Sequence, residues 1–297
     1  MPEFAEYIPL KPYTTYKIGG PARYFCTAES SLDLLDALRW CKGNGAPWFL
    51  LGGGSNVLIA DSGFPGLVIR LGGEFRRIGL NQKNGLVTVG GGVMLPKLGM
   101  TLVTRGWSGF EFMCGIPGTV RGAVRINAGT KHGETKDHFV SASVMTPECR
   151  METIGKEEMG FSYRHSRLVN RRDIVMEATF RLERKEDATV LKRRVQGGLA
   201  GRRRRQPKNK KNCGSVFKNP PGDKPAGWYL ERAGLKGKKI GDAIVAEEHA
   251  NWIVNLGNAT SQDVKRLIGL CQDRVFKAFG IPLEREVLFI PNDLNQP

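Results

Sequence analysis

Hydrophobic and polar residues follow two distinct periods along the chain. From Ile174 to Leu182 every second residue is apolar, and this period of two predicts a strand with one buried face. From Ser261 to Phe279 apolar residues recur at helical spacing and stop at Gly280, which predicts an amphipathic helix. The chain therefore contains both strands and helices, and an α+β fold is expected.

Shorter patterns extend this picture to the whole chain. We predict further strands at 23–27, 48–51, 66–71, 86–90, 252–255 and 286–290. Further helices are predicted from Ser30 or Ser31 to Gly43 or Gly45, at 96–105, from about 187 onward and at 225–233. These elements indicate three regions, at residues 1–72, 73–186 and 187–297.

Two glycine-dense segments each follow or adjoin an apolar run. They are LGGGSNVLIADSG, which starts at Leu51, and GIPGTVRGAVRINAG, which starts at Gly115. Glycine permits positive φ and has no Cβ, so backbone N–H groups can converge on an anion such as a diphosphate. A third fingerprint glycine is absent because Val57 stands in its place, and no GxxxxGK[ST] is present. We therefore expect a nucleotide-type cofactor held by loops rather than by a helix start.

Composition excludes several classes of protein. The 297 residues are 40% hydrophobic and 25% charged, as in ordinary globular proteins. The amino terminus lacks the apolar core of a signal peptide, and no run approaches the ~18 apolar residues of a membrane span. Six cysteines without CxxC and four histidines without HxH or HExxH predict reduced thiols and no metal site. We expect a soluble, cytoplasmic protein that has no membrane partner.

The net charge of +16 indicates anionic partners. The densest basic run, GRRRRQPKNKK, starts at Gly201, and it is interpreted mainly as a solvated helix end and loop. Binding of a polyanion is the alternative. No aromatic residues interleave with the run and no nucleic-acid motif is visible, so no nucleic-acid partner is expected.

Three short polar motifs are ambiguous by themselves. FSYRHS, starting at Phe161, is typical of an exposed strand edge, and its arginine of a surface ion pair. CGSVFKNP, starting at Cys213, offers a hydroxyl near a lysine, but its serine could equally bond its own backbone. LEREV, starting at Leu283, is typical of a solvent-exposed edge strand with alternating charges.

Taken together, the motifs give a specific resemblance. Eight of them occur in register over roughly residues 9 to 291: KIGGPA, LGGGSNVLI, GIPGTVRGAVRINAG, YRHS, GSVFKNP, AGWYLERAGLKGKKIG, HANWIVN and LEREV. This set closely resembles the UDP-N-acetylenolpyruvoylglucosamine reductase (MurB) family, and the compact spacing between YRHS and GSVFKNP resembles its shorter, second type.

The resemblance implies a fold and a reaction. The fold would be the two-subdomain FAD-binding fold of the vanillyl-alcohol-oxidase/MurB class, followed by a C-terminal α+β substrate-binding domain. The enzyme would be a UDP-N-acetylmuramate dehydrogenase of peptidoglycan precursor synthesis, with non-covalent FAD and with NADPH as co-substrate. Flavin N5 would deliver hydride to C3 of UDP-N-acetylglucosamine enolpyruvate, and C2 would then be protonated. Small molecules would be the only partners, and the protein would be a monomer.

The resemblance also assigns residues. Arg164 would stabilise the substrate carboxylate as charge develops on it, Glu286 would work with that arginine, and Ser215 would protonate C2, supported by Lys218 or water. Tyr163, Arg164, Lys218 and Asn219 would bind the substrate. The residues expected to hold FAD are Leu51, Gly52, Gly53, Gly54, Ser55, Asn56, Val57, Leu58, Gly115, Ile116, Pro117, Gly118, Thr119, Gly122, Ala123, Asn127, Ala128 and Gly129.

Arg121 departs from the family pattern, which usually has glycine at this position. Its cation could pair with a phosphate or with a protein carboxylate, and a positive φ would strain it. Two other functions stay open. One is an oxidase that tethers its flavin covalently, for which His132 is the plausible attachment point. The other is a basic binding protein that has lost its chemistry.

Overall fold

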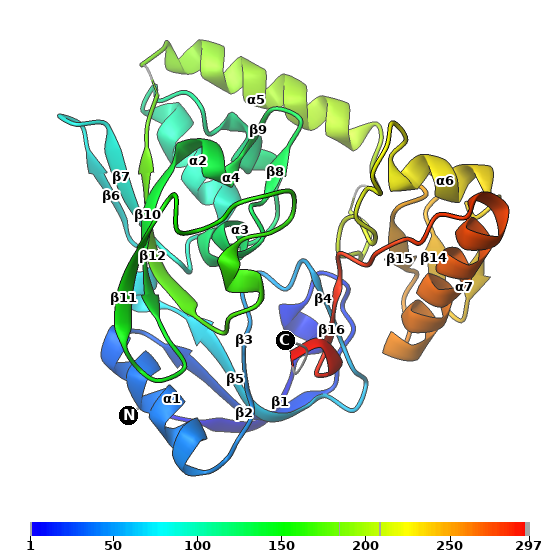
Figure 1. Ribbon diagram of the computed structural model, residues 1–297, viewed down its shortest axis with the longest axis horizontal. Coiled ribbons are helices and arrows are strands. Elements are labelled where there is room, and N and C mark those ends of the chain that lie inside the picture. Colours follow the sequence, from blue (N-terminus) through cyan, green and yellow to red (C-terminus); the bar gives the residue numbers. More distant parts are fainter. Residues whose placement is uncertain (1, 184, 208, 295–297) are drawn as a thin grey trace.

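The computed structural model describes residues 2–183, 185–207 and 209–294. The described elements form three parts that follow one another along the chain (Figure 1). Strands and helices occur in every part, in agreement with the predicted α+β class. None of the described helices is both long and apolar enough to cross a membrane.

The first part is a four-stranded sheet with one covering helix. Its strand order is β1-β2-β5-β3, with β2, β5 and β3 parallel and β1 antiparallel to β2. Helix α1 (Ser31–Gly43) begins where Ser30 and Asp33 form a capping box, as the sequence predicts. The strands are β1 (Ala5–Pro9), β2 (Pro21–Ala28), β3 (Trp48–Leu50) and β5 (Phe64–Leu71).

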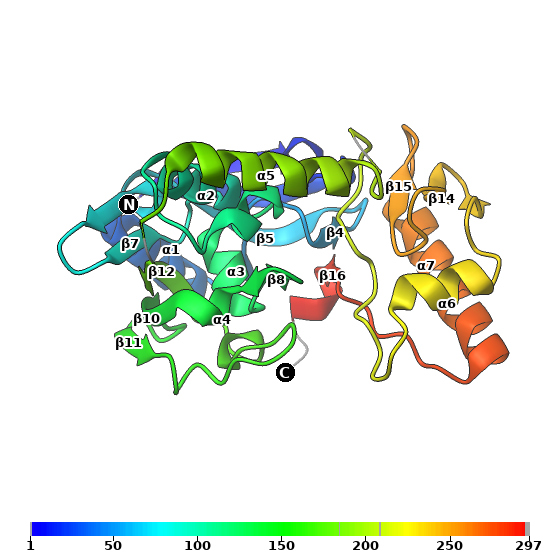
Figure 2. The same ribbon diagram turned by 90° about the horizontal axis from the view of Figure 1, so that it is seen from above.

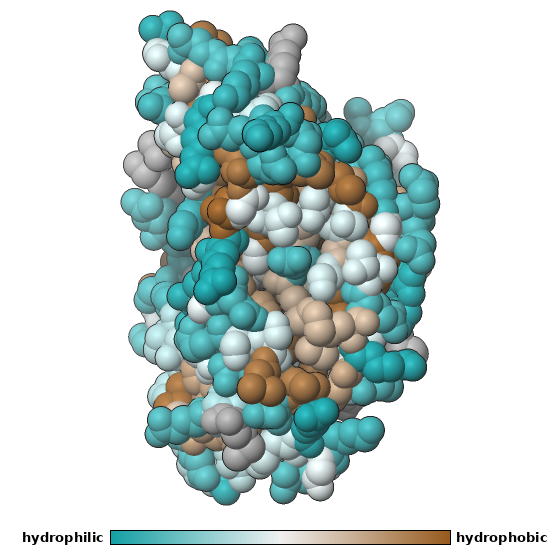
Figure 3. Space-filling view, turned by 90° about the vertical axis from the view of Figure 1, so that its left-hand side faces the viewer, coloured by the Kyte–Doolittle hydropathy of each residue, from teal (hydrophilic) through white to brown (hydrophobic). Residues whose placement is uncertain are grey.

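The second part is an antiparallel five-stranded sheet of order β11-β10-β12-β7-β6. The strand predicted at Ile174–Leu182 is confirmed as β12 (Ile174–Arg181), the central strand of this sheet. Helices α2 (Leu95–Thr104), α3 (Val120–Arg125) and α4 (Thr135–His138) accompany the sheet. The other strands are β6 (Ile78–Asn81), β7 (Leu86–Gly90), β10 (Phe139–Met145) and β11 (Met151–Gly155). Seen from the side where this sheet lies, hydrophobic residues gather in the middle of the face and hydrophilic residues surround them (Figure 3).

The third part packs two helices against a small sheet. Helix α7 (Ser261–Phe279) confirms the predicted amphipathic helix, and Gly280 ends it in the left-handed conformation at φ 69°. Helix α6 (Ala226–Arg232) lies beside it. The sheet has the order β13-β14-β15, formed by β13 (Lys239–Ile240), β14 (Ala243–Val245) and β15 (Ile253–Asn255).

Two elements connect the parts. Helix α5 (Ala188–Arg203) runs along the outside of the second part toward the third (Figure 2), and Leu191 and Val195 pack against Val103 and Cys114. Strand β16 (Leu288–Ile290) returns from the third part and pairs in parallel with β4 (Val57–Ile59). This last strand places the end of the C-terminal region against the first region. The division into three regions stays a prediction.

The remaining short elements lie in the connections. One is a two-stranded hairpin of β8 (Gly129–Thr130) and β9 (Gly133–Glu134). The others are 3-10 helices at Lys11–Tyr13, Gly73–Arg76, Glu111–Gly115, Arg167–Val169 and Asn292–Leu294.

Candidate active site

A cavity with a volume of about 340 Å³ is lined by residues of all three parts. Its size is that of a ligand pocket. Both glycine segments contribute to its wall, and so do Arg164, Ser215 and Glu286. The cavity is therefore the place where the predicted cofactor and catalytic residues meet.

The two glycine loops touch each other at this wall. A Cβ on Gly53 would lie 3.1 Å from Gly118 Cα, and one on Gly52 would lie 2.9 Å from Thr119 Oγ1. Ser55 Oγ donates a hydrogen bond of 3.1 Å to the carbonyl oxygen of Pro117. Backbones this close require glycine, and they leave main-chain groups, rather than side chains, facing the cavity.

We expect Gly54→Ala to disrupt this wall. Gly54 has φ 63°, and a Cβ there would collide with the carbonyl oxygen of Tyr13 and lie 2.8 Å from Thr14 Cα. The combined strain should lower the free energy of unfolding by ~2 kcal/mol or more. Thermal unfolding and the ratio of flavin to protein after purification measure the effect.

Gly269→Ala is the matched control, because Gly269 lies inside α7 and a Cβ there meets nothing within 4 Å. That change should be neutral or stabilising by up to ~1 kcal/mol. Equal stability of the Gly54 and Gly269 variants would contradict the steric argument.

The expectation of loops alone is wrong for the second glycine segment. Residues 116–119 form an irregular turn, but Val120–Arg125 form helix α3, and the side chain of its N-cap residue Thr119 accepts a hydrogen bond from the Gly122 N–H. Gly122 and Ala123 therefore lie on a helix. The glycines on either side of Val120 and Arg121 suggest a loop. Burial of Val120, Ala123 and Val124 nevertheless stabilises a helical turn here.

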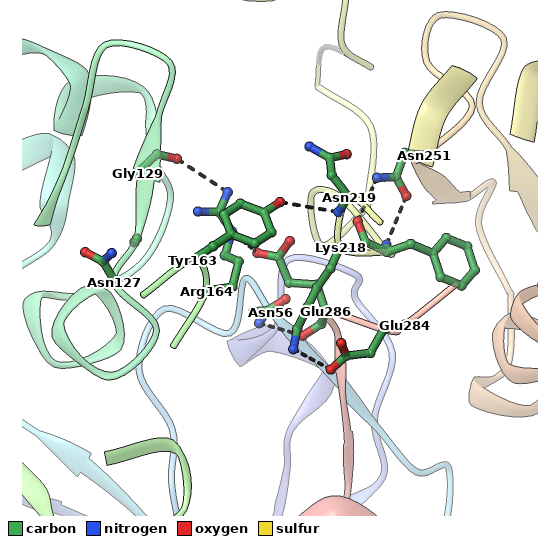
Figure 4. Close-up of polar contacts among 12 residues, drawn as sticks. Asn56, Asn127, Gly129, Tyr163, Arg164, Lys218, Asn219, Asn251, Glu284 and Glu286 are labelled. Atoms are coloured by element: carbon green, nitrogen blue, oxygen red, sulfur yellow. Dashed lines mark hydrogen bonds and ion pairs between the residues drawn. The ribbon is translucent and has the colours of Figure 1, made fainter. Parts of the chain in front are cut away.

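Arg164 and Glu286 form a shielded ion pair across the cavity. Arg164 Nε donates to Glu286 Oε1 at 2.8 Å, and the two side chains are only 20% and 15% exposed. Arg164 adopts φ 54°, a left-handed conformation that is strained for a non-glycine residue and is typical of functional sites. Figure 4 shows Arg164 and Tyr163 reaching toward Glu286 and Asn219 from the opposite side.

Burial raises the pKa of Glu286 above its ordinary value, while Arg164 and Lys218 oppose the rise. The interpretation of LEREV as solvent-exposed charges is therefore wrong for Glu286 but fits Glu284, whose side chain is 71% exposed. Glu286 is shielded by Arg164, which lies 122 positions earlier in the chain, and a local sequence pattern cannot predict such a contact.

Ser215 is positioned by pairing on both sides of its segment. It bridges to Trp252 in β-fashion, and the next residue, Val216, accepts a 2.8 Å hydrogen bond from the backbone N–H of Glu286. This pairing fixes the serine beside the segment that precedes β16 and carries the Glu286 carboxyl group. Ser215 lines the cavity together with Arg164 and Glu286, so the three predicted catalytic residues share one cavity.

Most of the predicted cofactor residues line the cavity, and two do not. The residues on its wall are Leu51, Gly52, Gly53, Gly54, Ser55, Asn56, Val57, Gly115, Ile116, Pro117, Gly118, Thr119, Gly122, Ala123, Ala128 and Gly129. Leu58 is buried in the core behind the wall. Asn127 is also buried, and its amide donates to Glu134 and to the Ser162 carbonyl while it accepts from the Lys136 N–H, so it holds loops together.

The predicted substrate residues other than Arg164 lie outside the cavity wall. Tyr163 accepts a hydrogen bond from the Asn219 N–H at 3.3 Å, and Lys218 forms an ion pair with Glu284 (Figure 4). Lys218 is therefore paired with a carboxylate. No hydrogen bond between Lys218 and the Ser215 hydroxyl is found among the described residues. These residues instead connect the second part of the chain to the third.

Sequence reasoning missed most of the cationic wall. Arg202 of the basic run donates to the Gly115 carbonyl, so the solvated-loop interpretation is wrong for this residue but fits the exposed Arg204 and Arg205. The six cavity arginines are Arg121, Arg125, Arg164, Arg171, Arg172 and Arg202, against the carboxylates Glu286 and Asp293. Arg171 and Arg172 also line the cavity, but they belong to none of the sequence motifs. Their position depends on the path of the chain rather than on residue spacing.

The cavity fits the FAD that the resemblance implies. Glycine backbones form a close wall and the arginine excess complements a diphosphate. His132, the attachment point of the covalent alternative, is exposed and does not line the cavity. Among residues 2–183, 185–207 and 209–294, no group of three or more metal-ligating side chains is placed to hold a metal ion.

Comparison with known proteins identifies the relatives of the chain. Residues 22–155 match the family described as an FAD binding domain, and residues 206–290 match the C-terminal domain of UDP-N-acetylenolpyruvoylglucosamine reductase. The chain is 44% identical over 279 residues to UDP-N-acetylenolpyruvoylglucosamine reductase 2 of Symbiobacterium thermophilum, covering 94% of this chain and 89% of that protein. A reductase of the same name from Heliobacterium modesticaldum is 44% identical over 283 residues, which are 95% and 89% of the two chains.

A solved structure is similar over the whole chain. The crystal structure of UDP-N-acetylenolpyruvylglucosamine reductase (MurB) from Thermus caldophilus matches with a TM-score of 0.84 and 38% identity, covering 98% of this chain and 100% of that one. The predicted fold class is thus confirmed. With an FAD-binding domain in its first half and relatives of this identity over nearly its full length, the chain belongs to the UDP-N-acetylenolpyruvoylglucosamine reductase family of oxidoreductases.

Proposed function

We propose that the chain reduces UDP-N-acetylglucosamine enolpyruvate to UDP-N-acetylmuramate at the expense of NADPH. The observation that carries the proposal is that Arg164, Ser215 and Glu286 line the same cavity as the two glycine segments. A guanidinium, a hydroxyl and a buried carboxyl are the groups that reduction of a carboxylate-bearing double bond requires. Family membership supplies the substrate class.

When bound between the two glycine segments, FAD would supply the two-electron chemistry that links NADPH to C3 of the enolpyruvyl group. The protein's part is to hold the reacting groups together and to shield them from water. Gly52, Gly53 and Gly118 let the backbone approach the cofactor closely. Asn56 ties this wall to the segment that carries the Glu286 carboxyl group, because its Nδ2 donates to the Glu286 carbonyl oxygen at 3.1 Å.

Arg164 would orient the substrate carboxylate and stabilise the negative charge that spreads onto it when C3 gains hydride. Nε is held by Glu286, so the rest of the guanidinium fork is left to face the substrate. Its terminal NH2 group also lies 3.5 Å from the Gly129 carbonyl oxygen, which restricts the side chain further. Such preorganised donors stabilise developing charge without reorganisation.

Ser215 would hand its hydroxyl proton to C2 once the carbanion has formed. A hydroxyl is a weak acid, so the serine needs a source that returns the proton to it. Because Lys218 is paired with Glu284, we assign that return to water rather than to the lysine. Tyr163, Lys218 and Asn219 are proposed to bind the nucleotide-sugar part of the substrate at the junction between the second and third parts.

With substrate bound, Glu286 would be protonated, so that its ion pair with Arg164 becomes a hydrogen bond accepted by one carboxyl oxygen, while the other oxygen donates to the substrate carboxylate. Since the pKa of Glu286 is raised by burial, the neutral form is present below that pKa and is lost as the pH rises through it. We therefore expect the sugar-nucleotide half-reaction to slow as the pH rises above the ordinary range of a glutamate.

Glu286→Gln tests this assignment. Glutamine donates a hydrogen bond at every pH, so the variant should keep the rate of the second half-reaction within about 10-fold and lose this pH dependence. Glu286→Ala should lose both donor and acceptor and be slower than the glutamine variant. An unchanged pH profile in Glu286→Gln would assign the titration to another group.

The overall function is tested by following both substrates in one reaction mixture. Purified protein with NADPH and UDP-N-acetylglucosamine enolpyruvate should consume them in equal amounts and give a product heavier by two hydrogens in mass spectrometry. A flavin oxidase would instead consume NADPH and oxygen, form hydrogen peroxide and leave the sugar nucleotide unchanged. A colourless protein that binds nucleic acid would support the binding-protein alternative.

A further inference from the structure

The Arg121 side chain lines the cavity and has no partner among the described residues. It lies on α3 and lines the cavity, and its Nε atom is buried without a hydrogen-bond partner. In the described part of the chain its guanidinium has no ion pair with a carboxylate. An unpaired buried cation is unfavourable, so a native structure that keeps one calls for a reason.

The other charged groups on this wall are satisfied differently. Arg164 pairs with Glu286, Arg171 with Asp173, and Asp293 with Arg285. Three more arginines donate to backbone carbonyl oxygens, which are Arg125 to Val169, Arg172 to Trp48 and Arg202 to Gly115. Among these cavity arginines Arg121 therefore stands apart, and no described carboxylate on the wall is left over for it.

The backbone holds Arg121 firmly in place. Its N–H donates to the Gly91 carbonyl oxygen at 2.9 Å, and the neighbouring Val120 N–H donates to the Val93 carbonyl oxygen at 2.9 Å. Both questions about this residue thus have an answer within the described part of the chain: the residue is helical, so positive φ does not strain it, and no described carboxylate pairs with it. Burial and the nearby Arg125 lower the pKa of Arg121 to about 9, which still leaves it cationic at neutral pH.

The structure assigns Arg121 to the diphosphate of FAD as its ion-pair partner. The diphosphate is the anionic group of FAD, and it carries two negative charges at neutral pH. Thr119 lies at the contact of the two glycine loops, and Arg121 follows it by two residues. Arg125 comes one helical turn later and also lines the cavity. Of the four cavity arginines that lack a carboxylate partner among the described residues, Arg121 and Arg125 are the two on this helix, and Arg121 is the one whose Nε has no hydrogen bond.

This inference rests on the FAD site of the proposed function and not on the reaction. Because the resemblance implies glycine at this position, the ion pair would be a feature of this chain. The backbone N–H groups of the glycine loops would then be supplemented by the cationic side chain of Arg121 at the diphosphate. Tighter retention of FAD is the expected consequence.

Arg121→Gln tests the assignment through binding rather than turnover. FAD is removed from the protein, and its rebinding is followed by quenching of flavin fluorescence at several salt concentrations. The dissociation constant for FAD should rise about 10- to 100-fold, and its salt dependence should weaken, because one charge-assisted bond is lost. The dissociation constant for riboflavin, which has no phosphate, should stay within about 2-fold of the unmodified protein's.

Two further variants separate charge from folding. Arg121→Lys keeps the charge but not the forked geometry, so it should fall between the unmodified protein and Arg121→Gln. Arg274→Gln removes the same charge from an exposed position on α7 and should change neither constant. Should Arg121→Gln fail to fold, Arg121→Gly, which restores the usual family residue, replaces it in the same measurement.

The assignment is overturned if the Arg121 variants bind FAD as tightly as the unmodified protein, or if they lose riboflavin and FAD affinity equally. Failure of the proposed function looks different. It would show as an unmodified protein that binds FAD tightly but does not convert the sugar nucleotide, and the affinity comparison would be unaffected.

Discussion

Ser215→Ala is expected to slow reoxidation of the flavin by UDP-N-acetylglucosamine enolpyruvate by about 10³-fold or more, which corresponds to ~4 kcal/mol of transition-state stabilisation. Reduction by NADPH should proceed at the unmodified rate, because that step needs no proton at C2. Stopped-flow absorbance measures the two steps separately. The split is expected because Ser215, which lines the same cavity as Arg164 and Glu286, would supply a proton only in the second step.

The fold should tolerate this change. Backbone pairing, through the Trp252 bridge and the Val216 carbonyl, fixes the segment, and neither contact uses the hydroxyl. Ser141→Ala on β10, away from the cavity wall, serves as the control and should leave both steps unchanged. Equal rates of reoxidation in Ser215→Ala and the unmodified protein would remove the serine from the mechanism.

Arg164→Gln should have the second large effect, slowing the same half-reaction by about 10²- to 10³-fold. The variant loses the donors that face the substrate carboxylate. It also leaves Glu286 without its cation, so the pKa of that buried carboxyl should rise further. The pH at which reoxidation slows should therefore move upward in the variant.

Arg164→Lys provides the informative comparison, since it restores a charge without the planar fork and should recover only part of the rate. Arg274→Gln controls for the change in net charge. An upward shift of the pH profile without loss of rate would make Arg164 a partner of Glu286 alone. A loss of NADPH-dependent reduction of equal size would show that the arginine serves flavin placement instead.

Local pattern predicted the elements that have one buried face. The alternation in β12 and the apolar stripe and Gly280 stop of α7 follow directly from burial of one side, so sequence alone located both. The glycine loops were also visible, because close backbone approach leaves glycine as the residue that fits. Their contact, Gly53 against Gly118, required the three-dimensional structure.

Long-range placement was not readable from the sequence. Strand β16 crosses from the third part to pair with β4, and Arg202 reaches the Gly115 carbonyl from α5. Neither depends on spacing between neighbours in the chain. Arg164 and Glu286 were identified by resemblance rather than by pattern, since by themselves both motifs are typical of solvent-exposed charges. Shielding of the pair arises only when the second and third parts come together.

The central claim is that the cavity joins a flavin to a proton donor and a carboxylate clamp around one carbon–carbon double bond. Anaerobic sequential mixing tests it most directly. NADPH is added first and should bleach the yellow flavin absorbance; UDP-N-acetylglucosamine enolpyruvate is added second and should restore it fully, with one sugar nucleotide consumed per flavin. A flavin that stays bleached after the second addition, and regains its colour only when oxygen is admitted, would contradict the account.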